Sequence, residues 1–200
     1  TETVAFKIQK LTPHIGAEIK GLDLNQEQSA ETMAALKQAW LDNIVLLFRG
    51  QELTQEAQLR ATKFFGEVGY LARPANEYPV GYDKLLPNVM LISNIRENGE
   101  PIGALPDGEM MFHSDGAYAK RPFRYTLLYA LEIPKVGGNT VFANLYQAYE
   151  ALPAALKNQL ANVHAEHIYY AGTVQKDKPS DSLTGSRTHP LFLPFLLYTS

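Results

Sequence analysis

The stretch Met110-Met111-Phe112-His113-Ser114-Asp115-Gly116 is the most informative part of the sequence. We expect residues 110–115 to form a β-strand, on which side chains two positions apart point to the same face. His113 and Asp115 would then present an imidazole nitrogen beside a carboxylate oxygen. These are two of the three ligands of the 2-His-1-carboxylate triad, which leaves positions open on Fe(II) for a co-substrate and O₂. The competing interpretation is a plain hydrogen bond between the two side chains, because the His-x-Asp spacing is common by chance.

The composition is that of an ordinary globular protein. The chain has 200 residues, of which 46% are hydrophobic and 20% charged, and this length suits one domain. The formal net charge of −3 provides no positive field for nucleic acid or for an anionic membrane. A small anionic substrate would therefore have to be bound by local arginine or lysine side chains.

The sequence contains no cysteine, which excludes disulfides, thiolate metal sites and a cysteine nucleophile. This usage fits a reducing cytoplasm. No apolar run approaches the roughly 20 residues that span a bilayer, and the amino end lacks the pattern of a signal peptide. We expect a cytoplasmic homo-oligomer that acts on a small-molecule substrate and has no nucleic-acid or membrane partner.

Hydrophobic periodicity divides the chain into short elements. Strands are expected at residues 6–11, 15–19, 44–48, 89–92, 110–115, 125–133 and 164–170, with a last apolar run at 191–198. Helices are expected at residues 27–42, from Thr54 to Gly66, from Asn144 to Leu152 with Gln147 completing a capping box, and from Pro153 onward. Residues 66–88 are expected to form an ordered loop. Many short strands with two early helices indicate one α+β or mainly β domain over residues 1–200.

Further motifs occur in a fixed order on both sides of His113. The upstream motifs are Pro13-His14-Ile15-Gly16-Ala17-Glu18-Ile19, Gly21-Leu22-Asp23-Leu24, Val45-Leu46-Leu47-Phe48-Arg49-Gly50 and Phe64-Phe65-Gly66-Glu67-Val68. The downstream motifs are Leu127-Leu128-Tyr129-Ala130-Leu131-Glu132-Ile133-Pro134, Gly137-Gly138-Asn139-Thr140-Val141-Phe142-Ala143-Asn144 and Ala148-Tyr149-Glu150-Ala151-Leu152-Pro153. This series resembles the taurine dioxygenase-like family of Fe(II)/2-oxoglutarate-dependent oxygenases, and the resemblance covers nearly the whole chain.

The resemblance implies a double-stranded β-helix (jelly-roll) core with flanking helices. It also implies Fe(II) as cofactor, with 2-oxoglutarate and O₂ as co-substrates and succinate as a product. By motif position, His113 and Asp115 would bind the metal, and the hydroxyl of Thr140 would donate to the distal carboxylate of 2-oxoglutarate. Taken alone, Thr140 would be a plain strand residue after a turn. Halogenating relatives carry a small residue in place of the carboxylate, so Asp115 favours hydroxylation or a related C–H oxidation.

The substrate is less well defined. Taurine-accepting members have a histidine and an asparagine where this sequence has Leu71 and Glu109. A carboxylate at Glu109 would repel a sulfonate, so taurine itself is not expected. Asn94 and Tyr118 are candidate substrate contacts. Their alternative interpretations are a polar turn residue and a half-buried aromatic residue.

The other histidines are expected to be structural. His164 and His167 lie three positions apart and would face opposite sides of a strand. His189 resembles a structural His-Pro element of the family, and His14 is expected at the surface.

The family's third ligand, a distal histidine, and its 2-oxoglutarate-binding arginine are missing from the sequence. Residues 190–200 contain no His, Arg or Lys. Three explanations stay open, namely a fragment of a longer chain, a degenerate relative and a chain completed by a partner. The functional alternative is a non-catalytic jelly-roll binding protein derived from the family. The predicted jelly roll is accordingly incomplete at its C-terminal end.

Overall fold

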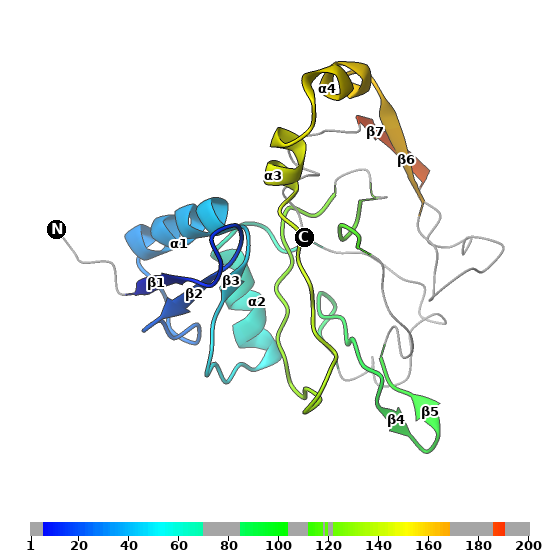
Figure 1. Ribbon diagram of the computed structural model, residues 1–200. Coiled ribbons are helices and arrows are strands. Elements are labelled where there is room, and N and C mark those ends of the chain that lie inside the picture. Colours follow the sequence, from blue (N-terminus) through cyan, green and yellow to red (C-terminus); the bar gives the residue numbers. More distant parts are fainter. Residues whose placement is uncertain are drawn as a thin grey trace. The chain divides into compact units, whose positions relative to one another are not determined.

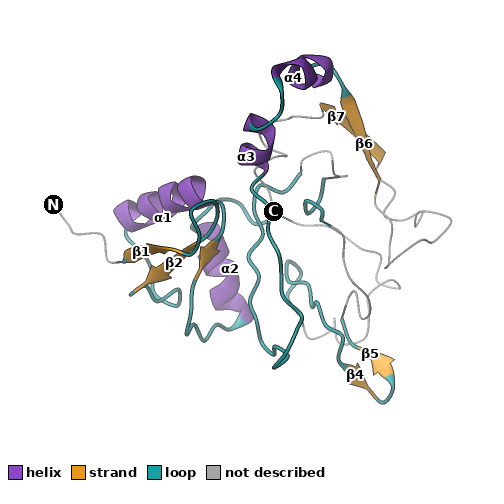
Figure 2. Ribbon diagram, viewed as in Figure 1, coloured by secondary structure: helices purple, strands orange, loops and turns teal. Residues whose placement is uncertain are grey.

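The computed structural model describes residues 6–69, 85–103, 112–117, 119, 122–168 and 186–190. The chain divides into two compact units, whose helices and strands are labelled in Figure 1 and distinguished by colour in Figure 2. The first unit comprises Thr1–Val68 with Leu127–Ala151, and the second comprises Gly69–Thr126 with Leu152–Ser200. None of the helices in the described ranges is long and apolar enough to cross a membrane.

The first unit contains a small mixed sheet. Strands β1 (Lys7–Lys10) and β2 (Ala17–Lys20) are antiparallel, and β2 pairs in parallel with β3 (Leu46–Leu47), in the order β1-β2-β3. Ala17 lies opposite Leu46 in the parallel pair. The structure confirms the two strands predicted at the amino end.

The two longer helices of the first unit each begin at a capping side chain. Helix α1 (Ala30–Asn43) begins after Ser29, whose hydroxyl accepts a hydrogen bond from the Thr32 N–H. Helix α2 (Gln55–Lys63) begins after Thr54, whose hydroxyl accepts from the Ala57 N–H. These bonds satisfy N–H groups that have no partner inside the helix. The predicted helices and the predicted cap at Thr54 are confirmed.

The strand predicted at residues 44–48 is only two residues long, because the chain turns tightly just before it. Ile44 has a φ of +68° and a ψ of −46°, and the Val45 N–H donates to the Asn43 carbonyl over 2.7 Å. This is close to the γ-turn that is rare because it is strained. The Asn43 carbonyl also accepts from the Gly16 N–H at 2.9 Å. The turn therefore joins the end of α1 to the chain that enters β2.

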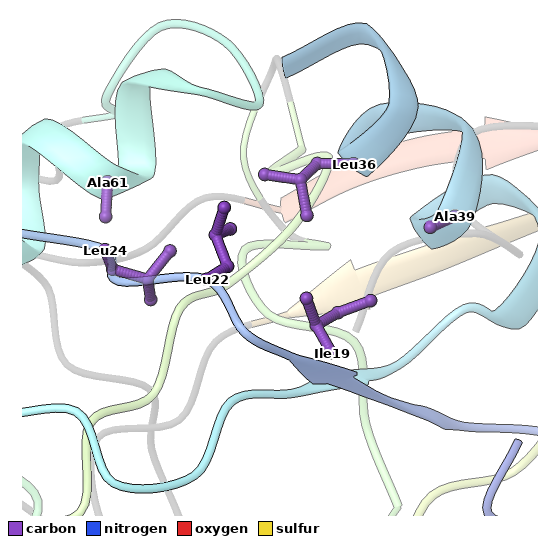
Figure 3. Close-up of a cluster of buried hydrophobic side chains, with 6 residues drawn as sticks. All are labelled: Ile19, Leu22, Leu24, Leu36, Ala39 and Ala61. Carbon is purple, nitrogen blue, oxygen red and sulfur yellow. The ribbon is translucent and has the colours of Figure 1, made fainter. Parts of the chain in front are cut away.

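The core of the first unit lies between β2, α1 and α2. Six buried side chains form it, and Figure 3 shows them: Ile19, Leu22, Leu24, Leu36, Ala39 and Ala61. Leu36 has no exposed surface, as expected for a residue on the apolar stripe of α1. The two alanines leave room for the larger side chains to interdigitate.

Gln51 and Tyr129 stabilise the loops around this core. The Gln51 amide accepts from the Leu24 N–H at 2.9 Å and donates to the Leu22 carbonyl at 3.0 Å. It thereby satisfies backbone groups that lack a strand partner. The Tyr129 hydroxyl accepts from the Leu53 N–H at 3.0 Å and donates to the Gln51 carbonyl at 3.3 Å. This residue attaches segment 127–143 to the N-terminal part of the unit.

The strand predicted at residues 125–133 is wrong, because this segment has no regular secondary structure. Several of its large apolar side chains are exposed: Leu128 at 66%, Leu131 at 76% and Ile133 at 74%. A strand depends on a partner that accepts its backbone hydrogen bonds, and β-propensity alone does not supply one. In the described part of the chain no strand pairs with it. The jelly roll accordingly stays a prediction, while the mixture of helices and small sheets is observed.

Helix α3 (Leu145–Glu150) completes the first unit. The Asn144 side-chain oxygen accepts from the Gln147 N–H at 3.1 Å, which confirms the Asn144 half of the predicted capping box. The Asn144 side-chain amide donates to the His14 carbonyl at 2.6 Å. One residue thus begins the helix and binds it to the β1–β2 turn.

In its described residues, the second unit contains two strand pairs and one helix. Strands β4 (Arg96–Glu97) and β5 (Glu100–Pro101) form a hairpin, and β6 (His164–Ile168) pairs antiparallel with β7 (Ser186–Pro190). The hairpin turns at Asn98-Gly99, both at positive φ, as this dipeptide favours in two-residue hairpin turns.

Helix α4 (Ala154–Leu160) belongs to the second unit and follows Pro153, which is its N-cap residue rather than its first residue. The predicted strand at 164–170 is confirmed over His164–Ile168. The strand predicted at 89–92 is wrong, since only an isolated bridge at Ile92 is present. The predicted apolar run at residues 191–198 lies outside the described residues.

Candidate metal centre

His113 and Asp115 lie on a turn in the second unit, not on the predicted strand. The Ala117 N–H donates to the Ser114 carbonyl at 3.3 Å, and Gly116 has a φ of +66°. A glycine adopts this conformation at little cost, and it bends the chain directly after Asp115. Phe112 and His113 have no strand pairing either. The strand prediction for residues 110–115 is therefore wrong over its described part.

The turn nevertheless brings the two side chains together. The Nε2 atom of His113 lies 3.1 Å from Oδ1 of Asp115. The side chains are 50% and 40% exposed, respectively, so both remain accessible to an ion or a ligand. The predicted convergence of an imidazole nitrogen and a carboxylate oxygen is observed, although it arises from a different backbone conformation.

The donor pair fits a divalent metal of octahedral preference. Two ligand atoms in adjacent positions of such an ion, each about 2.1 Å from it, lie about 3.0 Å apart. An imidazole nitrogen with a carboxylate oxygen is also the mixed donor set that Fe(II) accepts in oxygenases. The same separation suits a hydrogen bond from Nε2–H to the carboxylate. In the described ranges no group of three or more acidic, histidine or cysteine residues could hold a metal ion.

The second oxygen of Asp115 has a partner that the sequence did not indicate. The Thr126 hydroxyl donates to Oδ2 of Asp115 over 2.7 Å. The two carboxylate oxygens thus face different groups, Oδ1 toward His113 and Oδ2 toward Thr126. Only the fold could reveal this contact, because Thr126 lies eleven positions after Asp115 in the sequence.

Phe123 packs against the same turn. A Cβ atom added to Gly116 would lie 2.9 Å from the Phe123 ring, and one added to Gly69 would lie 2.6 Å from it. The ring therefore occupies the space that a side chain at either glycine would need. The neighbouring Tyr125 is partly buried, which raises the pKa of its phenol against the opposing effect of Arg124. Its hydroxyl thus stays protonated at neutral pH.

The structure does not test the roles predicted for the remaining candidate residues. Thr140 is exposed in the first unit, after Gly137 and Gly138 at positive φ. Asn94 is exposed in the chain preceding β4. Their roles stay predictions. The predictions for Tyr118, Leu71 and Glu109 fall on residues outside the described ranges.

The other histidines lie in strands and loops away from the turn in sequence. His164 is exposed in β6, and His167 pairs with Arg187 in the backbone register of β6 and β7. His189 lies opposite Ala165 in the same register. His14 is exposed, as expected, and its carbonyl accepts the bond from Asn144.

Comparison with known proteins gives consistent relatives. The family described as "Taurine catabolism dioxygenase TauD, TfdA family" matches residues 7–194. The chain is 32% identical to an alkylsulfatase of Acinetobacter baylyi, with 88% of this chain and 52% of the relative covered. It is 29% identical to an alpha-ketoglutarate-dependent 2,4-dichlorophenoxyacetate dioxygenase of Cupriavidus pinatubonensis, with 78% and 56% covered.

One similar solved structure is that of AAD-2 in complex with Mn(II) and N-oxalylglycine. It superimposes with a TM-score of 0.65 at 25% sequence identity, over 81% of this chain and 56% of the other. The chain thus spans about half the length of the curated relatives that it matches.

Proposed function

Because the chain belongs to the taurine catabolism dioxygenase TauD, TfdA family, we propose that its protein is an Fe(II)- and 2-oxoglutarate-dependent dioxygenase. It oxidises a small organic substrate by hydroxylation. One atom of O₂ enters that substrate and the other enters succinate, with loss of CO₂ from 2-oxoglutarate. The observation that carries the proposal is the 3.1 Å approach of His113 Nε2 to Asp115 Oδ1.

His113 and Asp115 are the proposed ligands from this chain. When bound, Fe(II) supplies a centre that activates O₂ beside 2-oxoglutarate. Thr140 is the proposed hydroxyl donor to the distal carboxylate of 2-oxoglutarate, where a hydrogen bond to a charged acceptor is strong. Asn94 and Tyr118 are proposed contacts for the substrate. The third ligand and the cation that pairs with 2-oxoglutarate are not provided by residues 190–200.

The family leaves the substrate open. The names of matching relatives include a dichlorophenoxyacetate dioxygenase, a sulfate ester dioxygenase and a sulfonate dioxygenase. We therefore propose only a small organic compound, and we propose the jelly roll as the architecture of the complete protein. The binding-protein alternative has less support, because the chain keeps the carboxylate Asp115 and the order of the family motifs.

The test is Fe(II)-dependent release of succinate, coupled to consumption of a substrate from a panel of small organic acids, sulfonates and sulfate esters. Asp115→Ala should abolish both readouts, because it removes a metal ligand and its compensating charge. Asp42→Ala is the matched control. That carboxylate accepts from Gln38 on an exposed part of α1, so the variant should retain both activities. Normal turnover by Asp115→Ala would refute the assignment.

A further inference from the structure

We propose that Thr126 is a positioning residue that fixes the orientation of the Asp115 carboxylate for metal binding. The inference rests on the proposed function, since it assigns the support of a proposed ligand. In this role Thr126 would contact neither the metal nor the substrate. It would act through the single hydrogen bond from its hydroxyl to Oδ2 of Asp115.

The two carboxylate oxygens of Asp115 have different partners. Oδ2 lies 2.7 Å from the Thr126 hydroxyl oxygen, whereas Oδ1 lies 3.1 Å from Nε2 of His113. An ionised carboxylate only accepts hydrogen bonds, so the hydroxyl must be the donor. A bond of this length to a charged acceptor is strong for a hydroxyl. The oxygen beside the imidazole is consequently the one that remains directed toward a metal.

The different partners matter because an aspartate carboxylate rotates easily about its last side-chain torsion. Rotation about χ2 of Asp has a broad, roughly two-fold profile, so a carboxylate without support could exchange its oxygens. It could also bind a metal through both of them. Holding Oδ2 on Thr126 favours binding through Oδ1 alone. That leaves one more coordination position open, which a metal that must also accept a co-substrate and O₂ requires.

The placement of Thr126 does not depend on its hydroxyl alone. Phe123, three residues earlier, packs its ring against Gly116, the residue that follows Asp115. Segment 123–126 therefore contacts the 114–117 turn at two points, one apolar and one polar. Replacing the hydroxyl by a methyl group should leave the apolar contact intact. Thr126→Val can then be used as a probe of the hydrogen bond.

The experiment measures binding of Mn(II) alone to the metal-free protein, by loss of the free-ion electron paramagnetic resonance signal. Mn(II) is chosen because the similar AAD-2 structure contains it. Thr126→Val should weaken Mn(II) binding by about 10- to 100-fold, the usual effect of removing a partner of a metal ligand. Thr126→Ser keeps the hydroxyl and should restore binding to within about 3-fold of the parent protein, well inside that range.

Two controls separate a positioning effect from general damage. The thermal midpoint of the metal-free Thr126→Val protein should match that of Thr126→Ser. Thr62→Val removes a hydroxyl that bonds the Gln58 carbonyl within α2, and it should leave Mn(II) affinity unchanged. A loss of affinity in Thr126→Val that Thr126→Ser does not repair would overturn the proposal, because the hydroxyl would then not be its cause.

The Asp115→Ala variant distinguishes failure of this inference from failure of the proposed function. If Asp115→Ala loses Mn(II) binding while Thr126→Val binds normally, the ligand assignment stands and the role of Thr126 is refuted. If Asp115→Ala binds Mn(II) as the parent does, or if the parent does not bind it, the metal site itself is refuted and the inference falls with it.

Discussion

Two regions of the first unit bury their apolar side chains to very different extents. Around α1 and α2, Leu36 has no exposed surface and Leu24 has 4%. In segment 127–143, Leu131 is 76% exposed and Val136 is 91% exposed. The first region forms its own core, whereas the second depends on one packed leucine, Leu127, and on the hydroxyl of Tyr129. Both regions contain large apolar side chains, but burial of these side chains stabilises only the region around α1 and α2 to a large extent.

The largest effect on the free energy of unfolding should come from a cavity in the buried core of the first unit. Leu36→Ala should lower the free energy of unfolding by about 2–5 kcal/mol, because it removes buried methyl groups and leaves a void. Leu131→Ala makes the same chemical change at an exposed site and should stay within about 0.5 kcal/mol of the parent. Urea denaturation of the metal-free protein measures both. Equal losses in the free energy of unfolding would contradict the difference in burial between the two regions.

A smaller effect should follow from detaching segment 127–143. Tyr129→Phe removes a hydroxyl that accepts from the Leu53 N–H and donates to the Gln51 carbonyl. Loss of such hydrogen bonds should lower the free energy of unfolding by about 1–3 kcal/mol, because a partly buried N–H loses its partner. Amide exchange of Leu53 should accelerate in the variant, and unchanged protection of that amide would contradict the role of Tyr129.

The smallest effect on stability concerns the loop at Asp23, beside the buried core of the first unit. The backbone N–H of Asn25, with the side chains of Asn25 and Gln26, hydrogen-bonds the Asp23 carboxylate and lowers its pKa below the ordinary value of 3.8. A folded-state pKa that is depressed adds stability above the unfolded value, and this stability is lost as the pH falls through the folded value. In urea denaturation of the parent protein, the part of the free energy of unfolding that Asp23 contributes should therefore decrease as the pH falls below about 3.8. Asp23→Asn should lack that part of the pH dependence. If the parent and the variant lost stability identically at acid pH, this role of the Asp23 carboxylate would be excluded.

Local signals explain which parts of the fold could be predicted. The cap at Thr54 and the cap at Asn144 each involve a backbone N–H only three residues away. Sequence alone therefore contains everything that these contacts need. The strand predicted at 125–133 depended instead on a distant partner, and no apolar pattern specifies that partner.

At the candidate site, the predicted contact between the two side chains was confirmed, whereas the predicted backbone conformation was wrong. The spacing of His113 and Asp115 indicated that their side chains would meet, and they do so at 3.1 Å. The expected strand was wrong because Gly116 takes a positive φ and the Ala117 N–H closes a turn. Thr126 could not be found from the sequence, since nothing in an isolated threonine indicates which carboxylate it will contact.

The close packing of Phe123 has a consequence for how this chain can change. Its ring fills the space beside both Gly69 and Gly116, so substitutions at these positions are energetically coupled rather than independent. A smaller side chain in place of Phe123 would make room for a methyl group at Gly69. It would not do the same at Gly116, whose φ of +66° disfavours any side chain. A side chain at position 69 is therefore better accommodated once position 123 has changed, because the Phe123 ring no longer fills that space.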